Sequence, residues 1–328
     1  MTRAAVFCLV ALCLAIAHRG ANAAETIVFK SLSLANFAAA YDGAPSGKEV
    51  ELSAELSLPE TGSAPYPAVV LVHGSGHPEN MSAWWADVVP ELNKNGIATL
   101  VIDSFTGRGV GRKGSSSDQA KISKASRVFD AFRALEFLKH DPRIDGARVG
   151  VTGYSFGGIV SFLAANKKIS TAMSGDGVPF AAHMPVYPSC QSRPAHSTLT
   201  GAPLTFLLGG KDAYTPAHFC EALVQDLTDT GEKVDLIKYP EAHHSWIRSF
   251  SVRRCPNCWT FTRCGVSTIT SDGYEKSEKY GFSTKGGWGS YVKKLARKCG
   301  KRGVLIGQNR EARSAAIAET VKFFKMNL

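Results

Sequence analysis

Apolar and polar side chains alternate along residues 48–58, whereas the apolar runs later in the chain are continuous. Strict alternation is typical of a half-buried strand that shows one face to solvent. Short continuous runs rich in branched side chains are typical of strands buried on both faces of a parallel sheet. Five such runs follow, at residues 68–72, 97–102, 149–152, 204–208 and 234–237.

Segments with a helical spacing of apolar residues lie between these strands. They are residues 82–95, 118–140, 157–166 and 217–230, and a closing amphipathic helix is expected at 312–326. Asp118 is expected to cap the long second helix, and Gly96 is expected to end the first. Strands that alternate with helices predict a doubly wound, mostly parallel α/β sheet.

Residues 249–303 interrupt this alternation of strands and helices. The segment contains four cysteines, several glycines and many basic residues, with little apolar periodicity. We therefore expect a single domain over residues 24–328, in which residues 249–303 form a cysteine-bearing excursion before the C-terminal helix.

The first 23 residues have the layout of a secretory signal peptide. Arg3 precedes an unbroken apolar run at residues 4–17, and Ala21 and Ala23 place small residues at positions −3 and −1 of a cleavage point. The apolar run is short against the ~20 residues needed to cross a bilayer. We expect no membrane span and an exported protein, either periplasmic or secreted.

Positive charge is in excess, at +10 for the whole sequence. Much of it comes late, from Lys285, Lys293, Lys294, Arg297, Lys298, Lys301 and Arg302. No aromatic interleaving or binding motif accompanies these residues, so a solvated basic face is the preferred interpretation. No nucleic acid partner is expected.

The sharpest local motif is GYSFGG at residues 153–158, which follows a strand-like run and opens an apolar helix. A G-x-S-x-G sequence in that position is a nucleophile elbow, which presents its serine hydroxyl at the top of the sheet. The glycines avoid side-chain clashes inside so tight a turn. The motif predicts Ser155 as a catalytic nucleophile and the α/β-hydrolase fold.

A serine nucleophile needs a base, and an acid must orient that base. On this fold the two follow the serine in the order acid, histidine. Asp212 comes just past the strand at residues 204–208, where open α/β sheets place their catalytic groups. Asp176, which follows the strand-like residues 171–174, is the alternative. His243 and His244 follow the next strand, and position alone does not separate them.

An oxyanion hole would complete the site with two backbone N–H donors. Phe156, directly after the nucleophile, is expected to supply one of them. The loop HGSG at residues 73–76 follows an early strand and is expected to supply the other, from Gly74 or Ser75. His73 is expected to brace this loop rather than to act as a base.

Six cysteines follow the signal peptide, namely Cys190, Cys220, Cys255, Cys258, Cys264 and Cys299. An even number in an exported protein predicts disulfides, although the spacing of the last four also permits a zinc site. Cys190 and Cys220 are expected to pair, because their segments should be neighbours at the carboxyl ends of adjacent strands. The last four would then pair among themselves.

Together these residues resemble the dienelactone hydrolase family of α/β-hydrolases. The shared marks are HGSG at 73–76, DSFTGRG at 103–109, FDAFRALEFL at 129–138, GYSFGG at 153–158, YPSC at 187–190, GGKDAYTPA at 209–217 and YPEAHHSW at 239–246. The resemblance implies Asp212 as the acid and His244 as the base. It also implies that Arg108 and Arg248 bind a substrate carboxylate. Ser155 stands where dienelactone hydrolase has cysteine, so the chain is most similar to exported serine-nucleophile relatives.

The expected function is a serine hydrolase that cleaves small carboxylic esters or lactones through an acyl-enzyme, without a cofactor or metal. A serine peptidase of the prolyl-oligopeptidase type shares fold and triad, but no propeller is expected before the catalytic part. A catalytically silent binding protein on a hydrolase scaffold is the second alternative. The intact set of serine, acid and histidine argues against it.

Overall fold

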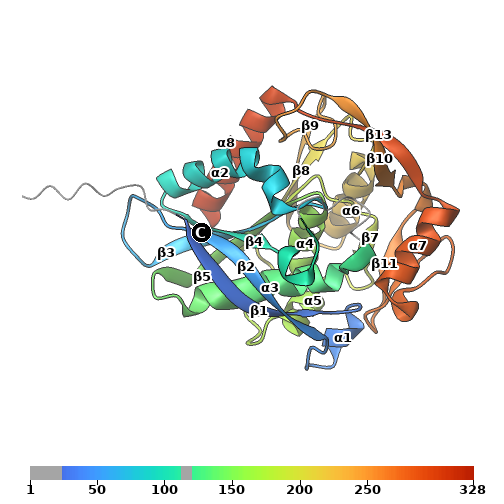
Figure 1. The fold of residues 1–328 in the computed structure, drawn as a ribbon, viewed down its shortest axis with the longest axis horizontal. Helices are drawn as coiled ribbons and strands as arrows, with labels where there is room; N and C mark the ends of the chain where they lie inside the picture. The colour runs from blue at the N-terminus through green and yellow to red at the C-terminus, as the bar shows by residue number, and fades with distance from the viewer. Residues whose placement is uncertain (1–23, 112–119) are drawn as a thin grey trace, which may run out of the picture.

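The computed structural model describes residues 24–111 and 120–328, so the expected signal peptide and the expected cap Asp118 lie outside the described residues. Eight strands form the central sheet: β1 (Glu25–Ser33), β2 (Lys48–Ser57), β3 (Tyr66–Val72), β4 (Ala98–Asp103), β5 (Ile144–Tyr154), β6 (Ala182–Val186), β8 (Leu204–Gly209) and β9 (Val234–Tyr239). Their order across the sheet is β1-β2-β4-β3-β5-β6-β8-β9 (Figure 1). The pairs from β4 to β9 are parallel, and β1 and β2 add an antiparallel edge, so the expected mostly parallel sheet is confirmed.

Helices cover both faces of the sheet. On one face lie α3 (Lys124–His140), α4 (Phe156–Ala164), α5 (Lys167–Met173) and α6 (Ala217–Asp229), and on the other lie α2 (Ser82–Lys94) and α8 (Arg310–Asn327). Strand β3 shows why two cores result: Val70 packs into the first and Leu71 into the second, since successive side chains of a strand point to opposite faces. Both are fully buried, as the continuous apolar run predicts.

The excursion at residues 249–303 folds against one end of this sheet, beside α6 (Figure 1). It contains β10 (Arg253–Thr260), β11 (Ser267–Ile269), β12 (Glu275–Ser277) and α7 (Trp288–Lys298), and β10 pairs with β13 (Lys301–Ile306). Strand β11 pairs in parallel with β7 (Ser192–Pro194), a short strand that follows β6. The excursion is thus joined to the main domain by backbone hydrogen bonds.

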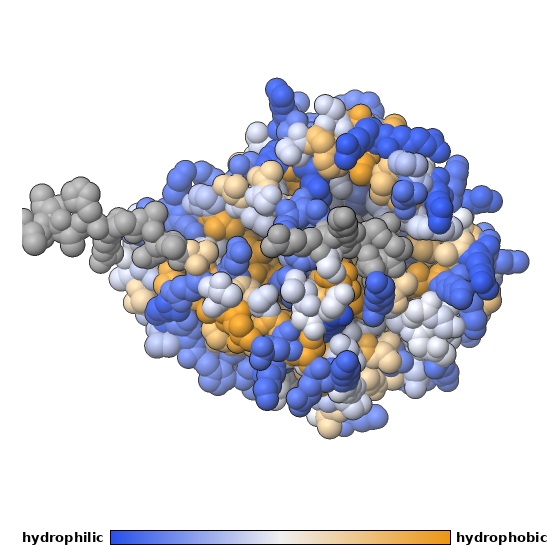
Figure 2. Space-filling model, viewed as in Figure 1, coloured by the Kyte–Doolittle hydropathy of each residue, from blue (hydrophilic) through white to orange (hydrophobic). Residues whose placement is uncertain are grey.

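The outer edge of the molecule, where α7 lies, is covered by hydrophilic side chains (Figure 2). Lys293, Lys294, Arg297 and Lys298 are exposed there, as expected of a solvated face. The chain also forms short helical turns, namely α1 (Ala38–Tyr41), η1 (Pro78–Met81), η2 (Thr106–Arg108), η4 (Thr262–Cys264) and η5 (Thr284–Gly286). Within the described ranges no helix combines the length and the apolarity that a bilayer span requires.

Three local expectations differ from the structure. Helix α3 begins at Lys124, because the Ser123 hydroxyl accepts the N–H of Ser126 and caps it. Residues 171–174, which read as a strand before Asp176, are the end and cap of helix α5. Helix α7 was not expected within the irregular excursion.

Candidate active site

Ser155 lies in the sharp turn between β5 and α4. Its backbone has φ 56° and ψ −112°, an unusual conformation for a residue with a side chain. The turn is held by the Ser155 N–H, which donates to the Val186 carbonyl at 2.9 Å. A side chain at Gly157 would collide with the Val72 carbonyl, so glycine is required there. Such strain is typical of functional sites and presents the serine hydroxyl toward the cavity.

A continuous hydrogen-bonded chain joins the serine, histidine and aspartate that the sequence pointed to. His244 Nε2 lies 3.0 Å from Ser155 Oγ, and His244 Nδ1 lies 2.7 Å from Asp212 Oδ2. His244 and Asp212 are buried, whereas Ser155 keeps partial exposure. The geometry is that of a nucleophile, a base and an orienting acid.

The Asp212 carboxylate is fixed by the loop that follows it. Its Oδ1 accepts the backbone N–H groups of Tyr214 and Thr215, both at 2.8 Å. Its Oδ2 accepts the Thr215 hydroxyl at 2.9 Å, as well as facing the histidine. Thr215 was missed by the sequence reasoning, although an aspartate followed by polar turn residues indicates such side-chain-to-backbone bonds.

The two candidate histidines have different surroundings. His243 is partly exposed, and its Nδ1 lies 3.0 Å from the Lys211 carbonyl, away from the serine. His244 alone of the two reaches both Ser155 and an acid. The alternative acid, Asp176, forms a surface ion pair with Lys139 and is not brought to the site.

The loop after β3 lies against the nucleophile, as an oxyanion-hole loop should. Gly74 and Ser75 line a cavity together with Ser155, and a Cβ added to Gly74 would lie 3.5 Å from the Ser155 Cβ. Phe156 is the first residue of α4, where backbone N–H groups and the helix dipole favour negative charge. The three expected donors are therefore grouped around the serine.

His73 braces this loop from behind. Its Nε2 accepts the Ser104 N–H at 3.3 Å, so its Nδ1 carries the proton and donates to the carbonyls of Gly74 and Gly76, each at 2.9 Å. Complete burial and the nearby Arg127 cation hold the pKa of His73 well below its usual range. A neutral histidine with both nitrogens occupied has a structural role, as expected.

Arg127, on α3, is a buried residue of the site that the sequence reasoning missed. Its guanidinium donates to the His73 carbonyl at 2.5 Å and to the Gly74 carbonyl at 3.4 Å. It lies between the rings of Phe105 and Phe156, with its Cζ 5.4 and 5.3 Å from their centroids. Burial lowers the pKa of Arg127 to about 9, so it remains a cation at neutral pH beside the loop at residues 73–76.

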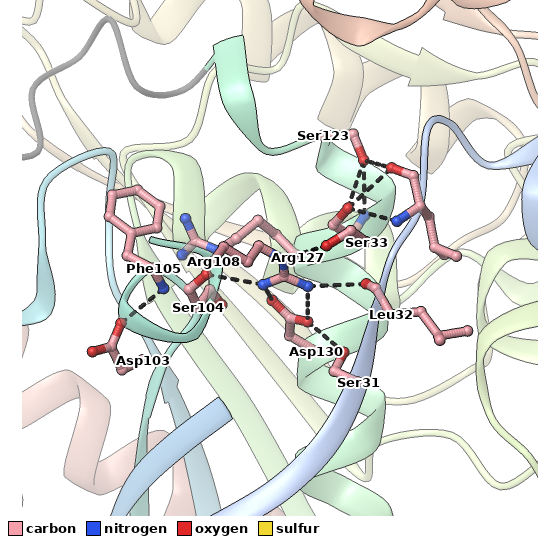
Figure 3. A network of polar contacts seen from close by, with 12 residues as sticks. Ser31, Leu32, Ser33, Asp103, Ser104, Phe105, Arg108, Ser123, Arg127 and Asp130 are labelled. Carbon is pink, nitrogen blue, oxygen red and sulfur yellow. Dashed lines mark hydrogen bonds and ion pairs between the residues drawn. The ribbon is translucent and has the colours of Figure 1, made fainter. Parts of the chain in front are cut away.

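Arg108 does not reach the cavity, and its expected contact with a substrate carboxylate is wrong. Its guanidinium makes a two-pronged ion pair with Asp130, with both N–O distances 2.8 Å (Figure 3). The remaining N–H groups donate to the Ser104 carbonyl, the Leu32 carbonyl and the Ser33 hydroxyl at 2.9 to 3.0 Å. With all five donors used, Arg108 ties the edge strand β1 to helix α3.

Arg248, in contrast, is brought to the site. It lines a cavity of about 270 Å³ together with Ser155 and His244. Partial burial lowers its pKa, and the Phe250 ring lies 5.4 Å from its Cζ. Among residues 24–111 and 120–328 no carboxylate forms an ion pair with it, so its cation faces the cavity without a counter-charge from these residues.

The cysteines pair as expected. Cys190 and Cys220 form a disulfide with a Cα–Cα distance of 4.9 Å, which joins the segment after β6 to the first turns of α6. The other four form the disulfides Cys255–Cys258 and Cys264–Cys299 within the excursion. Their sulfurs are bonded to one another rather than arranged as metal ligands.

Comparison with known proteins agrees with this geometry. The profile of the dienelactone hydrolase family matches residues 52–255. A carboxymethylenebutenolidase of Pseudomonas putida is 24% identical over 199 residues, which cover 57% of this chain and 78% of that protein. A candidate carboxymethylenebutenolidase of Yersinia pestis is 25% identical over 243 residues, which cover 67% and 86%. A candidate dienelactone hydrolase of Klebsiella pneumoniae has the same fold, with a TM-score of 0.52 at 15% identity over 92% of this chain and 98% of that one.

Proposed function

The chain belongs to the dienelactone hydrolase family and is a hydrolase of ester bonds, and we propose that it cleaves carboxylic esters or lactones through an acyl-enzyme on Ser155. The observation that carries this proposal is the hydrogen-bonded chain from Ser155 through His244 to Asp212. The substrate is a small molecule, and the proposed chemistry uses side chains and backbone groups only.

In the first half of the reaction, Ser155 Oγ attacks the ester carbonyl while His244 Nε2 takes its proton. Asp212 holds the imidazole in the tautomer that has its proton on Nδ1, and stabilises the imidazolium that forms. The oxyanion accepts the N–H of Phe156 and an N–H of the loop at Gly74 or Ser75. His244 then donates the proton to the leaving oxygen, and the alcohol departs.

In the second half, a water molecule takes the place of the alcohol. His244 removes a proton from this water as it attacks the acyl carbon, and the same oxyanion donors stabilise the second tetrahedral intermediate. Collapse of this intermediate releases the carboxylic acid and returns the proton to Ser155. The buried Arg127 cation adds to the positive potential behind the oxyanion loop.

We further propose that Arg248 favours substrates that carry a carboxylate near the scissile bond. It lies in the same cavity as the nucleophile, and its cation has no carboxylate partner among the described residues. A guanidinium can bind a carboxylate through two parallel hydrogen bonds, which gives geometric specificity as well as attraction.

Export from the cytoplasm is also part of the proposal. The support is the signal-peptide pattern of the first 23 residues and the involvement of six cysteines in disulfides. Disulfides form and persist in oxidising compartments. N-terminal sequencing of the mature protein, recovered from the periplasm or the medium of an expressing cell, should begin at Ala24, and recovery of an intact Met1 terminus would refute export with cleavage.

The proposed nucleophile is tested by covalent labelling. A fluorophosphonate probe should label the protein once, and peptide mapping should place the label on Ser155. The Ser155→Ala variant should not be labelled, and prior incubation with a hydrolysable ester should slow the labelling of the wild type. A folded wild-type protein that fails to react would instead support the silent-scaffold alternative.

A further inference from the structure

A second, larger cavity begins at the nucleophile and extends under the excursion. Its volume is about 410 Å³, within the range typical of small-molecule sites. Ser75, Ser155 and Tyr214 line both this cavity and the smaller one that contains Arg248, so the two meet at the serine. The site therefore has two compartments, and a substrate ester at Ser155 can extend into each.

The far wall of the larger cavity comes from a part of the chain that the family profile does not cover. That profile ends at residue 255, and the wall is built by Trp259 near the end of β10, by the turn η4 and by helix α7, all of which lie beyond residue 255. The wall is held rigidly: the Cys264–Cys299 disulfide joins η4 to the end of α7, and the Tyr291 hydroxyl lies 2.6 Å from Ser267 Oγ. The far wall of the cavity thus lies outside the part of the chain that the family profile describes.

Apolar and aromatic side chains dominate the lining of this cavity. They include Trp259, Phe261, Trp288 and Tyr291 from the excursion, and Phe156 and Ile159 from helix α4. Rings packed face to edge or offset against other rings gain more than the burial of their area alone. The composition favours a bulky aromatic group over a short aliphatic one.

Three charged residues line the cavity: Lys124 and Glu275 are paired with each other, and Lys293 is exposed to solvent. Lys124 Nζ lies 2.7 and 2.9 Å from the two carboxylate oxygens of Glu275, and both side chains are buried. Ser192 Oγ donates to the same carboxylate at 2.7 Å. Because the opposite charges satisfy each other, this end of the cavity offers no net charge to a ligand, unlike the compartment that contains Arg248.

The position of His244 indicates which half of the ester enters which compartment. His244 must donate a proton to the leaving oxygen, so the leaving alcohol lies on its side of the serine. His244 lines the smaller cavity and not the larger one. The acyl group therefore points the other way, under the excursion.

We propose that the larger cavity is an acyl-binding pocket formed by the excursion, selective for neutral, bulky aromatic acyl groups. This inference rests on the proposed ester hydrolysis at Ser155 and adds the class of substrate. The acid released by the reaction would then be an arylalkanoic acid or a related aromatic acid.

The test compares p-nitrophenyl 3-phenylpropanoate with p-nitrophenyl acetate. The two esters share a leaving group, and in both the carbonyl carbon bears an unbranched alkyl carbon, so they differ mainly in the phenyl ring of the acyl group. Burying one phenyl ring should raise kcat/KM for the aromatic ester about tenfold or more. The Val292→Trp substitution fills the cavity from α7 and should reduce the ratio of the two kcat/KM values about tenfold. Arg297→Trp, on the exposed face of the same helix, is the matched control and should leave this ratio unchanged.

A measurement on the unaltered enzyme removes any dependence on how the variant folds. Boronic acids add to a catalytic serine, and 2-phenylethylboronic acid should inhibit about tenfold more strongly than methylboronic acid. Equal inhibition by the two, or equal kcat/KM for the two esters, would overturn the acyl-pocket assignment while leaving ester hydrolysis intact. Failure of every ester, together with an unlabelled Ser155, would instead refute the proposed function itself.

Discussion

At the scale of single residues, the site depends on which atoms each side chain can reach. His243 and His244 are neighbours in the sequence, yet only His244 contacts Ser155 and Asp212, while His243 is directed to the Lys211 carbonyl. The pair offers an internal comparison, because the same substitution at either position removes one imidazole from the same loop.

The first prediction uses this comparison. Ser155→Ala and His244→Ala should each lower the kcat of ester hydrolysis by about 10⁴-fold or more, since members of a triad act as a unit. His243→Ala should change kcat less than about threefold, because it breaks one peripheral contact. Steady-state kinetics on a p-nitrophenyl ester provide the measurement, and reversed behaviour of the two histidine variants would show that the base is misassigned.

The second prediction concerns Arg248. 4-Carboxyphenyl acetate and 4-carbamoylphenyl acetate have leaving groups of similar shape, but only the first carries a carboxylate. The wild type should show about a tenfold lower KM for 4-carboxyphenyl acetate, as expected for a hydrogen bond to a charged group. Arg248→Ala should abolish the difference, and Arg248→Lys should not fully restore it, because an ammonium lacks the planar fork. Identical KM values for both esters in all three proteins would refute a carboxylate-binding role.

The third prediction follows from the burial of His183 in strand β6. Its Nδ1 lies 3.1 Å from the Ser161 carbonyl, its Nε2 is buried without a partner among the described residues, and burial lowers its pKa to about 4. The unfolded chain has the ordinary histidine pKa near 6.5 and therefore binds the proton first as the pH falls. The stabilisation is present above pH 6.5 and is lost as the pH falls from there toward 4.

Between pH 7 and pH 5 this residue should reduce the free energy of unfolding by about 2 kcal/mol. Urea unfolding at the two pH values, in the wild type and in His183→Gln, isolates the effect, because glutamine does not titrate. The decrease should be smaller in the variant by that amount. An equal decrease in both proteins would mean that His183 is not the group responsible.

At the scale of elements, loops and helices are held in place by a few cross-links near Asp212. The Cys190–Cys220 disulfide joins the segment after β6 to α6, directly after the Asp212 loop. The Thr215 hydroxyl also lies 3.2 Å from the Tyr187 carbonyl in that segment. The acid is thus positioned by contacts between two elements that are adjacent only in the folded sheet.

The fourth prediction compares this disulfide with the short one in the excursion. Replacing both Cys190 and Cys220 by alanine releases a loop with a sequence separation of 30, for which loop closure is worth about 4 kcal/mol. Replacing Cys255 and Cys258 by alanine opens a loop with a sequence separation of only 3. The expected loss in the free energy of unfolding is therefore about half as large. Denaturant unfolding measures both. The first variant should also lose esterase activity, and equal losses of stability would contradict the loop-closure argument.

At the scale of the whole molecule, the excursion is anchored to the main domain at one buried charge pair. Lys124 opens helix α3, and Glu275 lies in β12 of the excursion, 151 residues later. A lysine at a helix N-terminus is disfavoured by the helix dipole, and the glutamate compensates for it. The same pair forms the neutral end of the larger cavity, so anchoring and substrate selectivity share residues.

The fifth prediction tests this anchor. Glu275→Leu leaves the Lys124 ammonium buried without a counter-charge and should lower the free energy of unfolding by about 3–5 kcal/mol. The double variant Lys124→Met with Glu275→Leu removes both charges of the pair and should recover at least half of that loss. Urea denaturation of the three proteins gives the values. Equal stability of the single and double variants would indicate that the pair does not act as a unit.

Local sequence patterns were sufficient to predict most strands and helices of the main domain. The continuous apolar runs predicted the parallel strands, the glycine-rich turn around Ser155 predicted the elbow, and Asp212 was found from its place after a strand. Each depends on a few consecutive residues, whose spacing and conformational limits act locally. Helix α7 could have been found in the same way, since Trp288, Tyr291, Val292 and Leu295 recur at helical spacing.

Only the tertiary structure decided which distant groups meet. Arg108 was expected at the substrate and is instead fully engaged by Asp130, Ser104 and β1, while Arg127, which carried no motif, donates to carbonyls of the loop at residues 73–76. The aromatic cavity exists because the excursion folds back over α4, a contact between segments far apart in the chain. Local periodicity has no information about such contacts, because the energy of a buried ion pair or a cavity wall depends on the three-dimensional path of the whole chain.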